Sequence, residues 1–346
     1  MNPTSEVLKR IISSSQTHVD GVFTRLYRYL LREDIYLTAY KNLYANQGAA
    51  TKGTDNDTAD GFGTEYIAET IEKLRTQKYT PKPTRRTYIP KQNGKLRPLG
   101  IPSFRDKLVQ DCIRQILEAI CEPLFSDNSH GFRPNRSCHT AFDSIRYGFN
   151  GTRWFIEGDI KGCFDNIGHK ALLEILSRKI KDSKFINLIG AFLKAGYMED
   201  WTYHGTFSGT PQGGILSPIL ANIYLNELDK KVDEIAERFT VRETKHRTKA
   251  YGQATWAVDK LKKEYATTKS EEVKKRILKE IGLAKAKMAK LPVFAASNKR
   301  LRYVRYADDF IIGISGSRED CQRIKAELKA YLAEKLSLEL SDEKTK

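Results

Sequence analysis

Apolar residues recur at helical spacing along much of the chain. The stripes lie in residues 1–45, in a short segment near residue 70 and in residues 104–121. Their members are Val22, Phe23, Leu26, Tyr27 and Leu30, then Tyr66, Ile67, Ile71 and Leu74, and then Leu108, Cys112, Ile113, Ile116 and Ile120. Each stripe predicts a helix with one buried face. The polar, glycine-containing stretch 46–63 predicts a loop between the first two.

Two further helices are predicted from their starting residues. Asn166–Ile180 is expected to be helical, with Asp165 as its N-cap. Ser217 and Pro218 are expected to open another helix, as N-cap and first-turn proline.

Alternating or continuous apolar runs predict strands at Trp154–Ile160, 302–306 and 310–314. The Asn93-Gly94 pair, with prolines before it, predicts a hairpin in residues 78–97. The chain therefore combines helices with hairpin-connected strands, which favours an α+β fold.

The charge of the chain indicates the kind of partner that it binds. The 346 residues carry a net charge of +16, and 40% of them are hydrophobic, so a stable core and a polyanionic partner are both expected. No apolar run is long enough to cross a membrane and no secretory signal is present, so we expect a cytoplasmic protein. Five cysteines with no C-x-x-C spacing favour free thiols.

The basic residues are concentrated in two segments. Residues 78–97 contain seven Lys or Arg and no acid, and residues 241–300 contain 17 Lys or Arg against 6 Asp or Glu. A hairpin with uncompensated charge repels itself unless an anion binds it, so we expect Arg85 and Arg86 to contact a nucleic acid. Lys274, Lys275 and Arg276 are candidates in the second segment, which looks helical; a solvated helical hairpin is the alternative.

Acidic residues at strand ends carry the candidate chemistry. Asp308 and Asp309 are adjacent in the turn between two apolar strands, where their charges repel unless a cation binds. Asp159 ends another apolar strand. Three carboxylates of this kind suit Mg²⁺, and they would complete a site for two metal ions. Glu157 shares a face with Asp159 but lies further from the strand end, so we interpret it as structural.

Six short blocks occur in an order that resembles the reverse transcriptase domain of group II intron proteins. They are Arg97-Pro98-Leu99-Gly100-Ile101-Pro102, Gly131-Phe132-Arg133-Pro134, Gly158-Asp159-Ile160, Pro211-Gln212-Gly213, Tyr306-Ala307-Asp308-Asp309 and Ser341-Asp342-Glu343-Lys344-Thr345. The resemblance covers the chain from about residue 40 to its end. The family continues past the last block into a thumb, so the resemblance indicates a fragment.

The resemblance implies a right-hand polymerase fold of fingers and palm, in which an antiparallel palm sheet packs on helices. We expect a helical N-terminal extension and the start of the fingers in 1–78, and fingers with the basic hairpin in 79–155. The palm is expected in 156–346, with a basic helical insertion at about 234–300.

The resemblance also implies roles for individual residues. Asp159, Asp308 and Asp309 match the catalytic metal ligands, for two Mg²⁺ with Mn²⁺ as a substitute. Phe164 matches the aromatic ring that excludes the 2′-hydroxyl, and Gln212 matches a residue of the nucleotide pocket. Lys91 and Arg97 match the residues that bind the triphosphate. A two-residue Asn93-Gly94 turn would place those two on opposite faces, so the loop must be longer, or Lys95 replaces Lys91.

The implied function is RNA-directed DNA synthesis together with maturase activity. Its partners are intron RNA, an RNA template with a DNA primer, and deoxynucleoside triphosphates; a homodimer stays open. Two alternatives remain. One is an RNA-binding splicing scaffold with little polymerase activity, and the other is a bacterial reverse transcriptase outside introns, which is not expected to carry the insertion.

Overall fold

The computed structural model describes residues 3–46, 48, 50–90, 94, 96–210, 213–241, 248–291, 293 and 299–341. The helices, of which η denotes 3-10, are α1 Thr4–Thr17, η1 Tyr27–Leu31, α2 Glu33–Tyr44, η2 Ala59–Gly61, α3 Thr64–Arg75, α4 Phe104–Cys121, η3 Glu122–Leu124, α5 Cys138–Gly148, α6 Cys163–Asn166, α7 His169–Lys179, α8 Ser183–Lys194, α9 Ser217–Phe239, α10 Lys249–Thr267, α11 Glu271–Ala289 and α12 Arg318–Leu336. The strands are β1 Thr84–Pro90, β2 Leu96–Ile101, β3 Trp154–Asp159, β4 Tyr197–Glu199, β5 Thr202–His204, β6 Arg300–Tyr306 and β7 Asp309–Ser315.

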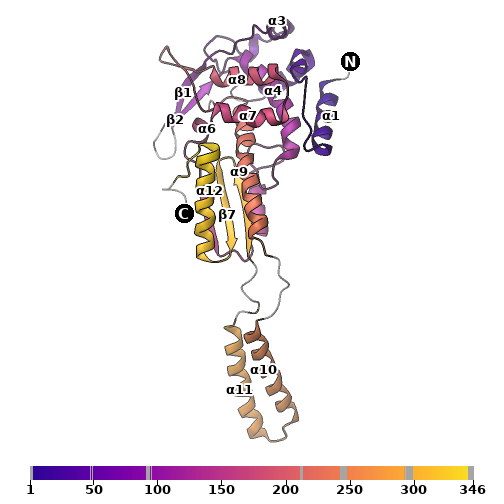
Figure 1. Cartoon of the computed structure of the whole chain (residues 1–346), viewed down its shortest axis with the longest axis vertical. Helices are drawn as coiled ribbons and strands as arrows, with labels where there is room; N and C mark the ends of the chain where they lie inside the picture. Colours follow the sequence, from indigo (N-terminus) through magenta and orange to yellow (C-terminus); the bar gives the residue numbers. More distant parts are fainter. Residues whose placement is uncertain are drawn as a thin grey trace.

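An antiparallel sheet with the order β3-β7-β6 forms the palm. Alternate side chains point to opposite faces of a strand, so Ile156, Phe310 and Ile312 are buried on one face. Helices α9 and α12 contact the sheet, and Figure 1 shows both running alongside it. Helix α5 contacts β6 and forms a small second cluster, with Ala141, Phe149 and Val304 buried. The expected α+β fold with an antiparallel sheet on helices is confirmed.

The fingers sheet has the order β2-β1-β4-β5. β1 and β2 form the expected antiparallel hairpin, and β1 also pairs in parallel with β4. β4 and β5 thus join the hairpin from a point almost 100 residues later in the chain. This pairing links the fingers to the segment just before α9.

Helix α4 is the centre of the large core. Most of its side chains are buried, and α1, α2 and α9 contact it. Its N-cap Ser103 accepts a hydrogen bond from the Asp106 N–H. The helix predicted over 104–121 is confirmed with the same bounds.

Three predictions near helix ends are wrong. Residues 22–26 are not helical, because Phe23 exchanges backbone hydrogen bonds with Lys179 and Lys181 at 2.8 Å; only a short 3-10 helix, η1, follows. Asp165 does not cap a long helix, because it lies inside α6, and α7 begins after Gly168. The helix at Ser217 is confirmed, but its N-cap is Leu216.

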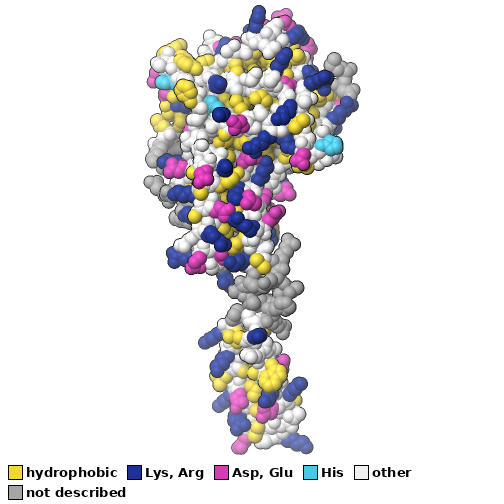
Figure 2. Space-filling model, viewed as in Figure 1, with side chains coloured by type: hydrophobic (Ala, Val, Ile, Leu, Met, Phe, Trp, Pro, Cys, Tyr) yellow, Lys and Arg dark blue, Asp and Glu magenta, His cyan; other side chains and the backbone are white. Residues whose placement is uncertain are grey.

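The segment predicted to be helical at 241–300 contains α10 and α11, which pack against each other. Val258, Ile277 and Ile281 are buried between them. Figure 1 shows the pair extending away from the sheets, and Figure 2 shows many basic side chains on its surface. No helix among the described residues is both long and apolar enough to span a membrane.

Candidate active site

The three candidate carboxylates come together at one end of the palm sheet. Asp159 and Asp309 are directly opposite each other in the register of β3 and β7. Residues paired in this way have Cα atoms about 4.5–5.5 Å apart. Asp308 precedes Asp309 in the turn from β6. The strand pairing therefore brings residues almost 150 positions apart into one site.

The turn that carries Asp308 has a left-handed residue, Ala307, with φ 57°. A non-glycine residue is strained in this region, so other groups must hold it. Arg305 Nη1 donates to the Ala307 carbonyl at 2.7 Å. A Cβ on Gly131 would lie 2.3 Å from the Ala307 nitrogen, so only glycine fits against the turn. The turn is thus fixed from both sides.

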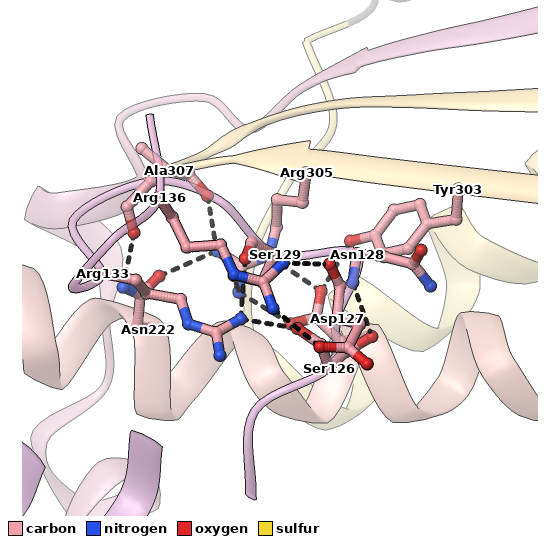
Figure 3. A network of polar contacts seen from close by, with 12 residues as sticks. Ser126, Asp127, Asn128, Ser129, Arg133, Arg136, Asn222, Tyr303, Arg305 and Ala307 are labelled. Atoms are coloured by element: carbon pink, nitrogen blue, oxygen red, sulfur yellow. Dashed lines mark hydrogen bonds and ion pairs between the residues drawn. The ribbon is translucent and has the colours of Figure 1, made fainter. Parts of the chain in front are cut away.

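Arg305 itself is completely buried and bonded in several directions. Its guanidinium pairs with Asp229 of α9 at 2.7 Å and also donates to Asn222 and Ser129. Burial alone would lower the pKa of Arg305, but the Asp229 carboxylate outweighs it and the pKa is raised. Figure 3 shows this network beneath the Ala307 turn. The network ties the turn that carries Asp308 to the long helix α9.

The loop that contains Gly131 is held in place by Arg133. The Arg133 guanidinium donates to the carbonyls of Ser126 and Ser129 at 2.6 and 2.7 Å and to the Glu122 carboxylate. The His130 N–H also donates to the Arg305 carbonyl. The Gly131-Phe132-Arg133-Pro134 block is therefore a brace for the carboxylate turn.

A cavity of about 680 Å³ joins the fingers to the palm carboxylates. Its lining includes Arg97 of β2, Phe164 of α6, Gly213, and the three aspartates Asp159, Asp308 and Asp309. The Phe164 ring meets Phe132 edge to face, with 6.3 Å between the ring centroids.

Burial, together with the nearby Asp308 charge, raises the pKa of the Cys163 thiol to about 12, so this thiol stays protonated at neutral pH.

The backbone around Phe164 is clamped by residues 208–210. The Phe164 and Ile167 carbonyls accept from Thr210 and Gly209 N–H groups at 2.7 and 2.8 Å. His169 Nε2 lies 2.7 Å from the Gly209 carbonyl. These bonds hold the backbone of α6, which carries Phe164, in place.

Gly213 lies against the fingers, with φ 102°, and a Cβ there would lie 2.9 Å from the Gly100 carbonyl. The buried Gln110 side chain accepts from the Ile215 N–H at 2.9 Å. Helix α4 therefore sets the position of the loop that contains Gly213 and Gly214. Gln212, the predicted pocket residue in this loop, lies outside the described residues.

The fingers hairpin does not have a two-residue turn. Pro90 pairs with Leu96 and Ile89 with Arg97, whereas an Asn93-Gly94 two-residue turn would pair Pro90 with Arg97. The connection is therefore longer, as required if Lys91 and Arg97 are to share a ligand. Arg97 lines the cavity, but Lys91 and Lys95 lie outside the described residues.

The basic side chains of the hairpin make more contacts within the fold than the sequence suggests. Lys82 pairs with Asp55 at 2.8 Å, so part of its charge is compensated. Arg85 donates to the carbonyls of Lys52 and Gly53, and the Arg86 guanidinium lies 3.6 Å from the Tyr197 ring centroid. Arg85 and Arg86 therefore have roles within the fold, and RNA contact by them stays a prediction.

The donor set fits a hard divalent cation, because carboxylate oxygens are its preferred ligands. In the described part of the chain, no three His, Cys, Asp or Glu side chains form a ready-made metal site. The fit thus rests on the backbone register that brings Asp159, Asp308 and Asp309 together.

Sequence reasoning missed Arg305, Asp229, Gln110 and His169. The alternation of β6 could have indicated a structural role for Arg305, because it falls on the same face of the strand as the buried Leu301 and Tyr303. The partners of these residues lie on distant helices, which local pattern does not reveal.

Comparison with known proteins identifies the family. Residues 89–248 match the family described as reverse transcriptase (RNA-dependent DNA polymerase). The chain is 54% identical over its whole length to the group II intron-encoded protein LtrA of Lactococcus lactis subsp. cremoris, of which it covers 58%. It is 38% identical over 90% of its length to the putative COX1/OXI3 intron 1 protein of Saccharomyces cerevisiae, covering 36% of that protein.

It is also 31% identical to protein YkfC of Escherichia coli, covering 99% of this chain and 84% of that one. The chain thus spans little more than half of LtrA but most of YkfC. The chain belongs to the group II intron-encoded family of reverse transcriptases and maturases.

Proposed function

We propose that the protein is an RNA-directed DNA polymerase that adds deoxynucleotides to a primer 3′-hydroxyl on an RNA template. One observation carries the proposal: a single cavity is lined by Asp159, Asp308 and Asp309 together with Arg97 and Phe164. Clustered acids are costly unless they bind cations. A cavity that also offers a cation and an aromatic wall suits a nucleoside triphosphate.

Reverse transcriptases use divalent metal ions, and Asp159, Asp308 and Asp309 would hold two Mg²⁺, or Mn²⁺ in their place. Bound there, the ions would activate the attacking oxygen and stabilise the leaving group. The protein's own contribution is position and charge. Arg97 binds the triphosphate, with Lys91 as its predicted partner, and Gln212 borders the nucleotide.

Phe164 selects the sugar in this proposal. Its carbonyl accepts a hydrogen bond from the Thr210 N–H, and its ring packs edge to face on Phe132 at the wall of the cavity. A 2′-hydroxyl would clash with the ring, and deoxynucleotides are therefore preferred.

We also propose that the protein binds group II intron RNA as a maturase. The support is the basic surface of α10 and α11, with Lys274, Lys275 and Arg276 on α11. Recognition of folded RNA relies largely on shape and backbone contacts, which such a surface can supply. The alternative, a splicing scaffold without polymerase activity, does not explain why the three carboxylates are clustered.

Primer extension tests the proposal. A DNA primer annealed to an RNA template is incubated with deoxynucleotides and Mg²⁺, using the chain alone and the chain continued by the part of LtrA that follows the matched region. We expect extension that stops when EDTA is added and returns with Mg²⁺. RNA binding without extension by either protein would favour the scaffold.

A further inference from the structure

A second aromatic ring lines the active-site cavity besides that of Phe164. Phe132, in the loop before α5, forms part of the cavity wall and is 55% exposed. A ring that is half exposed contributes little to a hydrophobic core, so core packing alone does not explain an aromatic residue at this position. Its place in the cavity wall makes it a candidate part of the site.

The backbone of Phe132 adopts a conformation that costs free energy. Its φ is 56°, in the left-handed region that glycine adopts readily and other residues avoid. Both neighbours impose this conformation, because Gly131 is pressed against the Ala307 backbone and Arg133 donates hydrogen bonds to two carbonyls of the same loop. Strained residues cluster at functional sites, where their surroundings hold them. The strain at Phe132 therefore points to a role for its side chain.

The Phe132 ring contacts the residue that is proposed to select the sugar. Its plane lies at 84° to the plane of the Phe164 ring, with 6.3 Å between the centroids. Aromatic pairs prefer this edge-to-face arrangement. The hydrogen bond from the Thr210 N–H holds the backbone of α6 but leaves the Phe164 side chain free to change rotamer. Contacts with other side chains therefore decide which way that ring points, and Phe132 supplies one of them.

We propose that Phe132 is a positioning residue for sugar selection, whose ring holds the Phe164 ring against the place of the 2′-hydroxyl. The inference rests on the proposed function, in which Phe164 excludes that hydroxyl. Gly131 supports the turn of Ala307, and the next residue, Phe132, supports Phe164. One loop therefore positions both the turn that carries Asp308 and the aromatic wall that selects the sugar.

The test measures kcat/KM for a deoxynucleotide and for the matching ribonucleotide, in the chain continued as for the primer-extension test. Phe132→Gly removes the ring but keeps the turn, because glycine adopts the left-handed conformation without strain. We expect kcat/KM for the ribonucleotide to rise roughly twofold to tenfold, the value of one aromatic pair. The value for the deoxynucleotide should stay close to that of the wild type, whereas damage to the fold would lower both. Phe132→Tyr keeps the ring and should retain the wild-type ratio.

Trp201→Gly is the matched control. Trp201 also has a left-handed backbone, with φ 65°, and it is 98% exposed in the turn between β4 and β5. Among the described residues, the cavity wall contains Phe132 but not Trp201. Both glycine variants remove an exposed ring and a strained conformation, so neither should lower the melting temperature by much. Only Phe132→Gly should change the ratio of the two kcat/KM values.

A double variant shows whether Phe132 acts through Phe164. Phe132→Gly combined with Phe164→Ala should discriminate no less than Phe164→Ala alone, because the ring that Phe132 positions is already gone. An unchanged ratio in Phe132→Gly, an equal fall in both kcat/KM values, or a further loss of discrimination in the double variant would overturn the inference. An unchanged ratio in Phe164→Ala would instead reject the sugar wall itself, and failure of the wild type to extend a primer would reject the polymerase function.

Discussion

At the scale of single residues, the site depends on side chains that do not face the substrate. Arg305 bonds the carbonyl of Ala307, whose strained conformation directs Asp308, and it is anchored by the buried Asp229. Gly131 fits against the same turn because it has no Cβ. A charge buried in this way is tolerated only when its partner stays in place.

The Arg305–Asp229 pair gives a prediction about stability. Arg305→Met should lower the free energy of unfolding by about 3–5 kcal/mol, because the buried Asp229 carboxylate loses its ion-pair partner and keeps only the hydrogen bond from Tyr303. Adding Asp229→Leu should restore much of that loss. The control Arg178→Met breaks the pair of an exposed arginine with Glu227 and should cost at most about 1 kcal/mol. Urea unfolding measures all variants, and equal costs for the two arginines would contradict the prediction.

Phe164 gives a prediction about sugar selection. Phe164→Ala should raise ribonucleotide incorporation relative to deoxynucleotide incorporation, because the wall against the 2′-hydroxyl is removed. Phe164→Tyr keeps the ring and should retain the wild-type preference. The measurement is the ratio of the two kcat/KM values. An unchanged ratio in the alanine variant would show that Phe164 only packs in the core.

At the scale of elements, long periodic segments were predictable and their junctions were not. The helix at 104–121 and the strands around Asp308 follow from local pattern, because each buries one face. Residues 22–26 have a helical pattern, but tertiary pairing of Phe23 with the end of α7 prevails. The three aspartates were predicted as a cluster from strand ends and turn chemistry, and the register of β3 and β7 places Asp159 opposite Asp309. The supporting contacts of Arg305 and Gln110 were not, because their partners are distant in sequence.

The junction of α1 and α2 should make stability depend on pH. Asp34 accepts hydrogen bonds from the Thr4 N–H and hydroxyl and from Arg32. Burial opposes ionisation, but these bonds outweigh it and lower the pKa of Asp34 to about 2. A lowered pKa stabilises the fold above the unfolded pKa of about 4. The cost of Asp34→Asn should therefore shrink as pH falls from about 4 to about 2, as measured by urea unfolding; a cost independent of pH would contradict this.

The basic helix α11 should contribute to RNA affinity. Replacing Lys274, Lys275 and Arg276 with Gln should weaken intron RNA binding and reduce its log–log salt slope by roughly one unit for each phosphate that is no longer bound. Extension on a short template should change much less. The same replacement of Lys285, Lys287 and Lys290 at the end of this helix shows whether the effect is local. Equal slopes in the wild type and the first variant would indicate that its charges are only solvated.

At the scale of the whole molecule, the two sheets meet at one cavity. The fingers contribute Arg97, the palm contributes the carboxylates, and the segment between them contributes Phe164. The link is made by backbone contacts, in which Gly213 approaches Gly100 and β1 pairs with β4. The arrangement of distant segments, rather than any single motif, produces a site suited to nucleotide transfer.

The most direct test of this account is primer extension on an RNA template by isosteric variants of the acids on β3 and in the β6–β7 turn. In the chain continued by the part of LtrA that follows the matched region, Asp159→Asn and Asp308→Asn should each abolish extension, while melting temperatures stay the same or rise as repulsion is relieved. Glu157→Gln, on the same face of β3 and paired with Ile311, should extend at close to the wild-type rate. Near-normal extension by either aspartate variant would contradict the account.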